Sequence, residues 1–220
     1  MENYNKLPDI ETINNNINPT LVSPNSFYEI SFYQTPESTI NVEDYKRFIQ
    51  NGIKRFRNSI TYKEYKGRLM SIGLDRCQVL GNITSEMADI EMHHCILTIF
   101  DVATIISNHI LNTTGRLSTF DLVEALKYEH CHHNVPICML TKTAHQLYHN
   151  NEEFYVSPRA IIGNWWNLIR KYNTGLTMDI AFKILFYIKR AIDEGDCTDD
   201  HNLLSLKDEI TNWAYINNIQ

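Results

Sequence analysis

Residues 89–94 read DIEMHH, and residues 143–149 read TAHQLYH. The first stretch alternates apolar and polar side chains, which predicts a β-strand that ends in His93 and His94. The second places His145 and His149 four residues apart, and on a helix this spacing puts both side chains on one face. Eight of the nine histidines lie between these two stretches or within them, so the sequence predicts its chemistry at the centre of the chain.

The elements expected around these stretches indicate an α+β, mostly helical fold. A strand at about 77–80 is expected to form a β-hairpin with the strand 89–93 across Gly81 and Asn82. A short apolar run follows at 135–140, in which Pro136 permits only an edge or entry position. Apolar spacing, caps and glycines predict helices at about 42–53, 62–72, 98–112, 118–130, 143–149, 160–172, 178–194 and 203–216.

The chain has 220 residues, of which 43% are hydrophobic and 21% charged. These values are typical of a compact globular protein and exclude a coiled coil or a wholly disordered chain. We expect an extended N-terminal arm at 1–40, a basic helical segment at 41–76, a core at 77–150 with a helical insertion at about 98–130, and a C-terminal helical region at 151–220. Four aromatic residues at 27–33 are expected to dock the arm on the domain or on a partner subunit.

The sequence shows no feature of an exported or membrane protein. Its start does not resemble a secretory signal, and no apolar stretch reaches the roughly 20 residues that a membrane span needs. Five cysteines without a CxxC pair indicate neither a disulfide framework nor a cysteine-type zinc knuckle, and Cys77, Cys95 and Cys138 are expected in the core. About one residue in ten is asparagine, a bias that AT-rich genomes produce. We therefore expect a cytoplasmic protein of a bacterium or of a phage-infected cell.

Charge is segregated along the chain, whose net charge is −6. Residues 54–76 carry a net charge of +5, which leaves −11 for the rest. The acidic balance argues against a protein that coats nucleic acid by bulk electrostatics, but a local basic patch can still bind phosphates. The residues expected to contact a DNA backbone are Lys54, Arg55, Arg57, Lys63, Lys66, Arg68 and Arg76.

The order of the central residues resembles the HNH group of the His-Me-finger (ββα-metal) nucleases. A strand ends in His93 and His94, Asn134 precedes a short apolar run, and a helix carries His145 and His149. The resemblance covers about residues 77–150 and implies a hairpin and a helix that clamp one divalent metal ion through His93, His145 and His149. It also implies that His94 is the general base and that Asn134 orients the ring of His94.

The function implied by this resemblance is that of a metal-dependent endonuclease that hydrolyses DNA phosphodiester bonds. An imidazole with a pKa near 6.5 can deprotonate water at neutral pH, while the metal stabilises the phosphate and the departing 3′ oxygen. Three imidazole nitrogens favour zinc or another transition metal, with magnesium as an alternative. The chain departs from the pattern because about 40 residues, predicted to contain two helices, separate His94 from Asn134.

Other hypotheses stay open on the sequence alone. The ββα core could be a catalytically inactive structural or interaction module, encoded by a phage, that retains a metal ion. The histidines could instead form no metal site and serve packing and helix capping in an all-helical regulator. The segment EHCHH at 129–133 is a rival histidine group, for which the end of a helix is the simpler interpretation. Trp165 and Trp166 could stack on unpaired bases, but one buried and one half-buried tryptophan is the simpler prediction.

Overall fold

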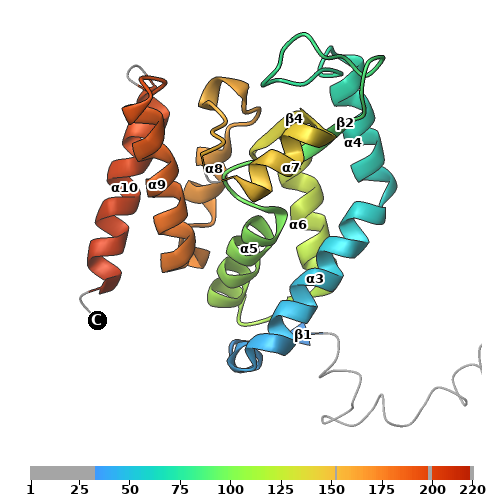
Figure 1. Ribbon diagram of the computed structural model, residues 1–220. Helices are drawn as coiled ribbons and strands as arrows, with labels where there is room; N and C mark the ends of the chain where they lie inside the picture. Colours follow the sequence, from blue (N-terminus) through green and yellow to red (C-terminus); the bar gives the residue numbers. More distant parts are fainter. Residues whose placement is uncertain (1–32, 152, 198–199, 219–220) are drawn as a thin grey trace, which may run out of the picture.

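The computed structural model describes residues 33–151, 153–197 and 200–218. Figure 1 shows helices around a small central sheet, which confirms the predicted α+β, mostly helical class. The strands are β1 (Tyr33–Gln34), β2 (Ile90–His94), β3 (Leu117–Ser118) and β4 (Ile137–Thr141). The α-helices are α3 (Val42–Asn58), α4 (Ile60–Ser71), α5 (Ile99–Thr114), α6 (Thr119–Cys131), α7 (Lys142–Asn150), α8 (Trp165–Lys171), α9 (Met178–Asp193) and α10 (His201–Asn218), and the 3-10 helices are η2 (Pro36–Ile40), η3 (Pro158–Ala160) and η4 (Asn173–Gly175).

The central sheet pairs β2 with β4 in antiparallel register, with His93 opposite Cys138. The predicted hairpin between 77–80 and β2 is therefore wrong. Residues 77–80 form turns instead, although the backbone N–H of Gln78 donates to the carbonyl of Met139 at 2.8 Å and so lies beside β4. All five residues of β4 are buried, whereas Val79 and Leu80 are exposed. β4 is the better partner because pairing it with β2 buries a continuous apolar run.

The predicted helical insertion separates these two strands in the sequence. α5 and α6 begin at the N-caps Thr98 and Ser118, and each helix closes a capping box with an aspartate three residues later. Between the two helices, β3 pairs with β1. The chain returns at Pro136, which precedes β4 and occupies the entry position expected for it. As a result β2, β4 and α7 form one ββα unit in space, although β2 and β4 are far apart in the sequence.

α3 and α4 run along one side of the molecule (Figure 1). Asn41 caps α3 by accepting from the backbone N–H of Asp44, as predicted, and the helix continues to Asn58 instead of ending near residue 53. Its apolar face packs against α5 and α6. α4 ends at Ser71, and Gly73 follows with φ of 96°, the left-handed conformation expected of a glycine that ends a helix.

The C-terminal helices α9 and α10 pack on each other at the other end of the molecule from α3 (Figure 1). Trp165 is buried and Trp166 half-buried, which confirms the structural interpretation of this pair. η4 contacts α5 so closely that a Cβ on Gly175 would collide with the backbone carbonyl of Ile105. Glycine is therefore required here by close approach of two backbones.

Three further sequence predictions concern the core, the membrane and the arm. Cys77, Cys95 and Cys138 are fully buried, as predicted. No helix in the described part of the chain is both long and apolar enough to cross a bilayer. Most of the predicted arm lies outside the described residues, while its end forms β1 and η2.

Candidate metal centre

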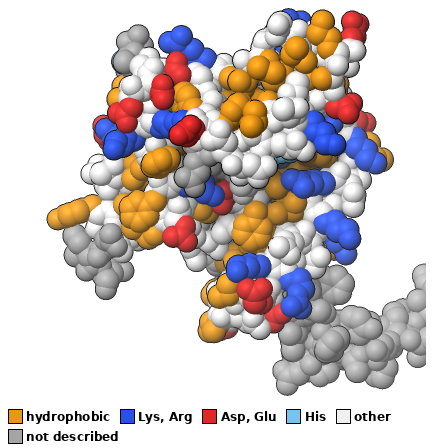
Figure 2. All heavy atoms as spheres, in the orientation of Figure 1, with side chains coloured by type: hydrophobic (Ala, Val, Ile, Leu, Met, Phe, Trp, Pro, Cys, Tyr) orange, Lys and Arg blue, Asp and Glu red, His pale blue; other side chains and the backbone are white. Residues whose placement is uncertain are grey.

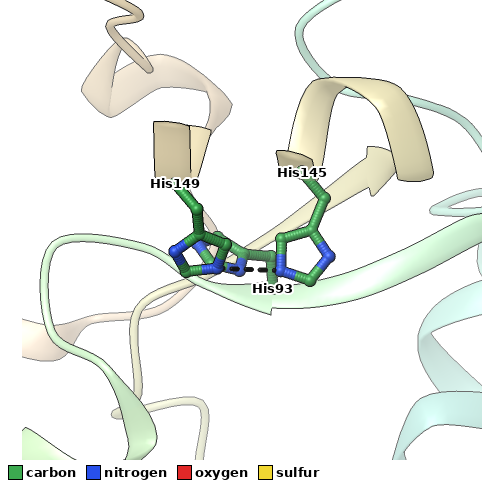
Figure 3. Close-up of side chains that lie close together, drawn as sticks. All are labelled: His93, His145 and His149. Carbon is green, nitrogen blue, oxygen red and sulfur yellow. Dashed lines mark hydrogen bonds between the residues drawn. The ribbon is translucent and has the colours of Figure 1, made fainter. Parts of the chain in front are cut away.

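His93, His145 and His149 converge on one point (Figure 3). His93 comes from β2, and His145 and His149 come from consecutive turns of α7. One ring nitrogen of each residue lies within 4.8 Å of the other two, and the Nε2 atoms of His145 and His149 are 3.1 Å apart. The structure thus brings together the three residues that the sequence analysis named as candidate metal ligands.

The local fold explains this convergence. Thr141 is both the last residue of β4 and the N-cap of α7, and its side chain accepts from the backbone N–H of Ala144. Without a loop between them, the helix packs against β2 and β4. One face of α7 then carries His145 and His149 over the side of β2 on which His93 stands.

His93 is buried within the cluster. Its Nε2 has no hydrogen-bond partner in the described part of the chain. Burial, together with the nearby His145 and His149, lowers the pKa of His93 to about 3, so the ring is neutral at physiological pH. A buried, unpaired nitrogen is costly, and a bound cation would satisfy its lone pair.

Glu91 determines which ring nitrogen of His145 faces the cluster as an acceptor. A carboxylate can only accept a hydrogen bond, so Nδ1 of His145 carries the proton and donates to Oε2 of Glu91 at 2.5 Å. The lone pair of Nε2 therefore points to the side shared with His149. A carboxylate behind a histidine in this way is the usual support of a metal-binding imidazole, because it fixes the ring and raises its basicity.

These residues fit one transition-metal ion. Zinc binds imidazole nitrogen at about 2.0–2.1 Å with tetrahedral geometry, which places ligand nitrogens roughly 3.4 Å apart. The candidate ligand atoms of His93, His145 and His149 all lie within 4.8 Å of one another, which is close to that spacing. Three neutral imidazoles suit zinc or another transition metal better than magnesium, which prefers oxygen ligands.

His94 lies on the opposite side of β2 from His93 and does not face the cluster. It is buried, and its Nε2 is 3.0 Å from Nε2 of His130. Nδ1 of His130 donates in turn to the carbonyl of Leu126 at 2.7 Å. Burial, followed by the nearby His130, holds the pKa of His94 well below its usual value. The position of His94 does not support the general-base role, because adjacent strand residues point to opposite faces and the opposite face here is core.

The position of Asn134 likewise does not support a role beside His94. Its side-chain nitrogen donates to Oε2 of Glu129 at 2.7 Å. Glu129 is fully buried and also accepts from Lys171 at 2.5 Å and from the hydroxyl of Tyr172 at 2.7 Å. Asn134 thus completes a network that ties the end of α6 to the end of α8.

The remaining candidate residues stand apart from the cluster. The predicted DNA-contacting residues lie on α3, α4 and the loop after α4, whereas the cluster belongs to β2 and α7. In the rival segment 129–133, His130 pairs with His94, and Nδ1 of His132 donates to the carbonyl of Tyr128 at 2.8 Å. These contacts belong to the end of α6.

The sequence patterns did not predict the role of Glu91 or the contact between His130 and His94. Glu91 lies two residues before His93, and that spacing on a strand places both on one face, so the signal was present. The contact of His130 with His94 had no comparable signal, because it joins a strand to a distant helix.

The fold and the cluster together define a helical α+β protein with a three-histidine candidate metal centre on a ββα unit. A family model described as Bacteriophage G278-like virion protein matches residues 2–215. The chain belongs to this family of bacteriophage virion proteins. No curated protein and no solved structure matches it.

Proposed function

We propose that this virion protein is a structural component of the phage particle. We further propose that one divalent transition-metal ion, most simply zinc, binds to its ββα unit and stabilises it. The observation that carries the proposal is the convergence of His93, His145 and His149 with the carboxylate of Glu91 behind His145. A cluster of this kind, with one ligand nitrogen buried and unpaired, matches the donor set of a metal site.

The bound metal would join two segments that are far apart in the sequence. His93 and His145 lie on either side of the α5–α6 insertion, so the ion ties the end of β2 to α7. Binding to the folded chain alone stabilises it by about 2.7 kcal/mol when the free metal is at 100 times its dissociation constant. For a protein of this size, that corresponds to a rise in melting temperature of roughly 5–10 °C.

The placement of His94 favours a structural role over a catalytic one. Hydrolysis needs a base within hydrogen-bond reach of the attacking water. His94, the residue predicted for this task, is buried on the other face of β2 and bonded to His130. The carboxylate of Glu91, the other candidate for a base, accepts a hydrogen bond from His145.

The endonuclease function implied by the resemblance is the second candidate, and one observation favours it. Three protein ligands leave a fourth position on a tetrahedral ion, which is the pattern of catalytic zinc sites, and His149 is exposed to solvent. In this case a group other than His94 would have to accept the proton of the attacking water.

The test uses one purified sample for metal content, thermal unfolding and supercoiled-plasmid cleavage with zinc, nickel, manganese and magnesium. The variant is His149→Ala, which removes an exposed ligand, and the matched control is His201→Ala, an exposed histidine at the start of α10. We expect one metal per chain in the wild type and the control, a lower melting temperature after chelation, and no cleavage.

The other outcomes separate the alternatives. Cleavage that requires metal and disappears in His149→Ala would replace the structural proposal by the nuclease. A wild-type protein that takes up none of the four metals, and whose melting temperature chelators leave unchanged, would refute both.

A further inference from the structure

The C-terminal half of α3 and the helix α4 carry a group of Lys and Arg side chains. Figure 2 shows Lys and Arg side chains gathered on the side of the molecule where these helices run. We define the basic face by six residues, of which five are exposed and Lys66 is half-buried: Lys54, Arg55, Arg57, Lys63, Lys66 and Arg68. Glu64 is the one carboxylate between residues 54 and 71.

Among the residues that the structure describes, the cations of this face differ from most other cations because they have no carboxylate partner. In the part of the chain that the structure describes, carboxylate partners within 4.0 Å occur for Lys46, Arg47, Lys127, Arg170, Lys171 and Lys183, among others. None of the six residues of the basic face has one within those described ranges. No carboxylate of the described residues therefore neutralises their charge.

Helix electrostatics explain only part of this charge. Arg55 and Arg57 occupy the last turn of α3, where cations are favoured by the helix dipole. Lys63 lies near the start of α4, where the dipole disfavours a cation, and the first turn of α4 contains no acidic residue. Arg68 lies in the last turn of α4, where a cation is favoured, so the helix dipole leaves the charges of Lys63 and Lys66 unexplained.

The side chains that lie between these cations indicate which class of macromolecule the basic face fits. Besides the charged residues, the exposed positions from 50 to 68 are Gln50, Asn51, Asn58, Ile60 and Gly67. Protein interfaces usually have an apolar centre, and proteins that bind single-stranded nucleic acids usually stack the bases on aromatic side chains. Ile60 is the one large apolar residue exposed in this range, and no aromatic side chain is exposed there. Lys, Arg, Asn and Gln are the side chains that contact the phosphates of a duplex.

We propose that the basic face binds the phosphate backbone of duplex DNA without sequence preference. This goes beyond the structural role proposed above and does not depend on the metal centre, because the basic face and the cluster lie on different elements. The acidic remainder of the chain limits binding to this one face, since it repels DNA elsewhere.

Binding of this kind is strongly salt-dependent. If five of the six cations each neutralise one phosphate, the slope of log K against log salt is about −4.5. Affinity then falls roughly 500-fold when salt rises from about 50 mM to about 200 mM.

The experiment measures the anisotropy of a labelled 30-base-pair duplex with the full-length protein at several salt concentrations. The variant is the triple substitution Lys63→Gln, Lys66→Gln and Arg68→Gln. The control is Lys142→Gln, Lys189→Gln and Lys207→Gln, which changes the net charge equally outside the basic face. A single strand of equal length and polyglutamate serve as competitors.

We expect the variant on α4 to make the slope less steep by about three, while the control keeps the wild-type slope. We expect two duplexes of unrelated sequence to bind alike. No duplex binding at low salt, an equal loss in both triple variants, or stronger binding of the single strand or of polyglutamate would overturn the proposal.

Discussion

Replacing Glu91 tests whether the candidate metal centre is built as the structure indicates. Glu91 does not belong to the three-histidine cluster, yet its Oε2 accepts the Nδ1 proton of His145 at 2.5 Å. Glu91→Gln keeps a hydrogen-bond acceptor but removes the charge, and Glu91→Ala removes both. If the carboxylate fixes the ring of His145 for metal binding, both variants should bind zinc more weakly while retaining all three histidines.

The size of the effect follows from the exposure of the pair. Loss of the group behind a metal-binding histidine costs about 10-fold to 100-fold in metal affinity. The side chains of His145 and Glu91 are 29% and 40% exposed, so water can replace part of the lost interaction. We therefore expect about a tenfold loss for Glu91→Gln, or roughly 1.4 kcal/mol, and a larger loss within the same range for Glu91→Ala.

The assay is a competitive zinc titration against a chromophoric chelator of known affinity, with one metal per chain required at saturation. Glu43→Gln is the matched control, because Glu43 pairs with Lys46 on the exposed surface of α3. Wild-type affinity in both Glu91 variants would refute the argument that Glu91 positions His145. A chain that binds no zinc even as wild type would instead refute the metal site itself.

Two further predictions concern stability. Burial lowers the pKa of His130 to about 4 in the folded chain. As the pH falls below about 6.5, the unfolded chain binds a proton at this residue and the folded chain does not. The stability that His130 contributes above pH 6.5 is therefore lost as the pH falls toward 4. His93 and His94, whose pKa values burial also lowers, act in the same direction. In urea titrations of chelator-treated protein, the free energy of unfolding should therefore fall by about 2 kcal/mol or more between pH 7 and pH 5, and a flat profile would contradict this. Gly175→Ala should destabilise the protein by about 2 kcal/mol or more because its Cβ meets the backbone of α5, whereas Gly67→Ala, with open space around its Cβ on α4, should stabilise it by about 0.5–1 kcal/mol. Equal melting temperatures for these two variants would show that the contact of η4 with α5 is not tight.

The sequence predicted the helices better than the strand pairing. The caps at Asn41, Thr98 and Ser118 are local signals, because a cap bonds to backbone only three residues away. The pairing of β2 with β4 is a tertiary choice between two apolar segments. Proximity in the sequence favoured residues 77–80 as the partner of β2. In the structure β2 pairs instead with β4, whose five residues are all buried.

The difference between local signals and tertiary contacts also explains which parts of the candidate metal centre the sequence predicted. The i, i+4 spacing of His145 and His149 and the strand position of His93 predicted the three residues that converge. The roles of His94 and Asn134 depended on what surrounds them. His130 from α6 and Glu129 occupy those surroundings, and no spacing rule in the sequence reports such contacts.

The α5–α6 insertion also orders events during folding. The strands β2 and β4 can pair only after some 40 intervening residues have been compacted, and long-range pairing of this kind is slow compared with the formation of single helices. Two of the histidines, on α7, are neighbours as soon as that helix forms, but the third reaches them only when the sheet closes. We therefore expect the newly made chain to acquire full metal affinity late, so that tight loading with zinc reports completion of the fold.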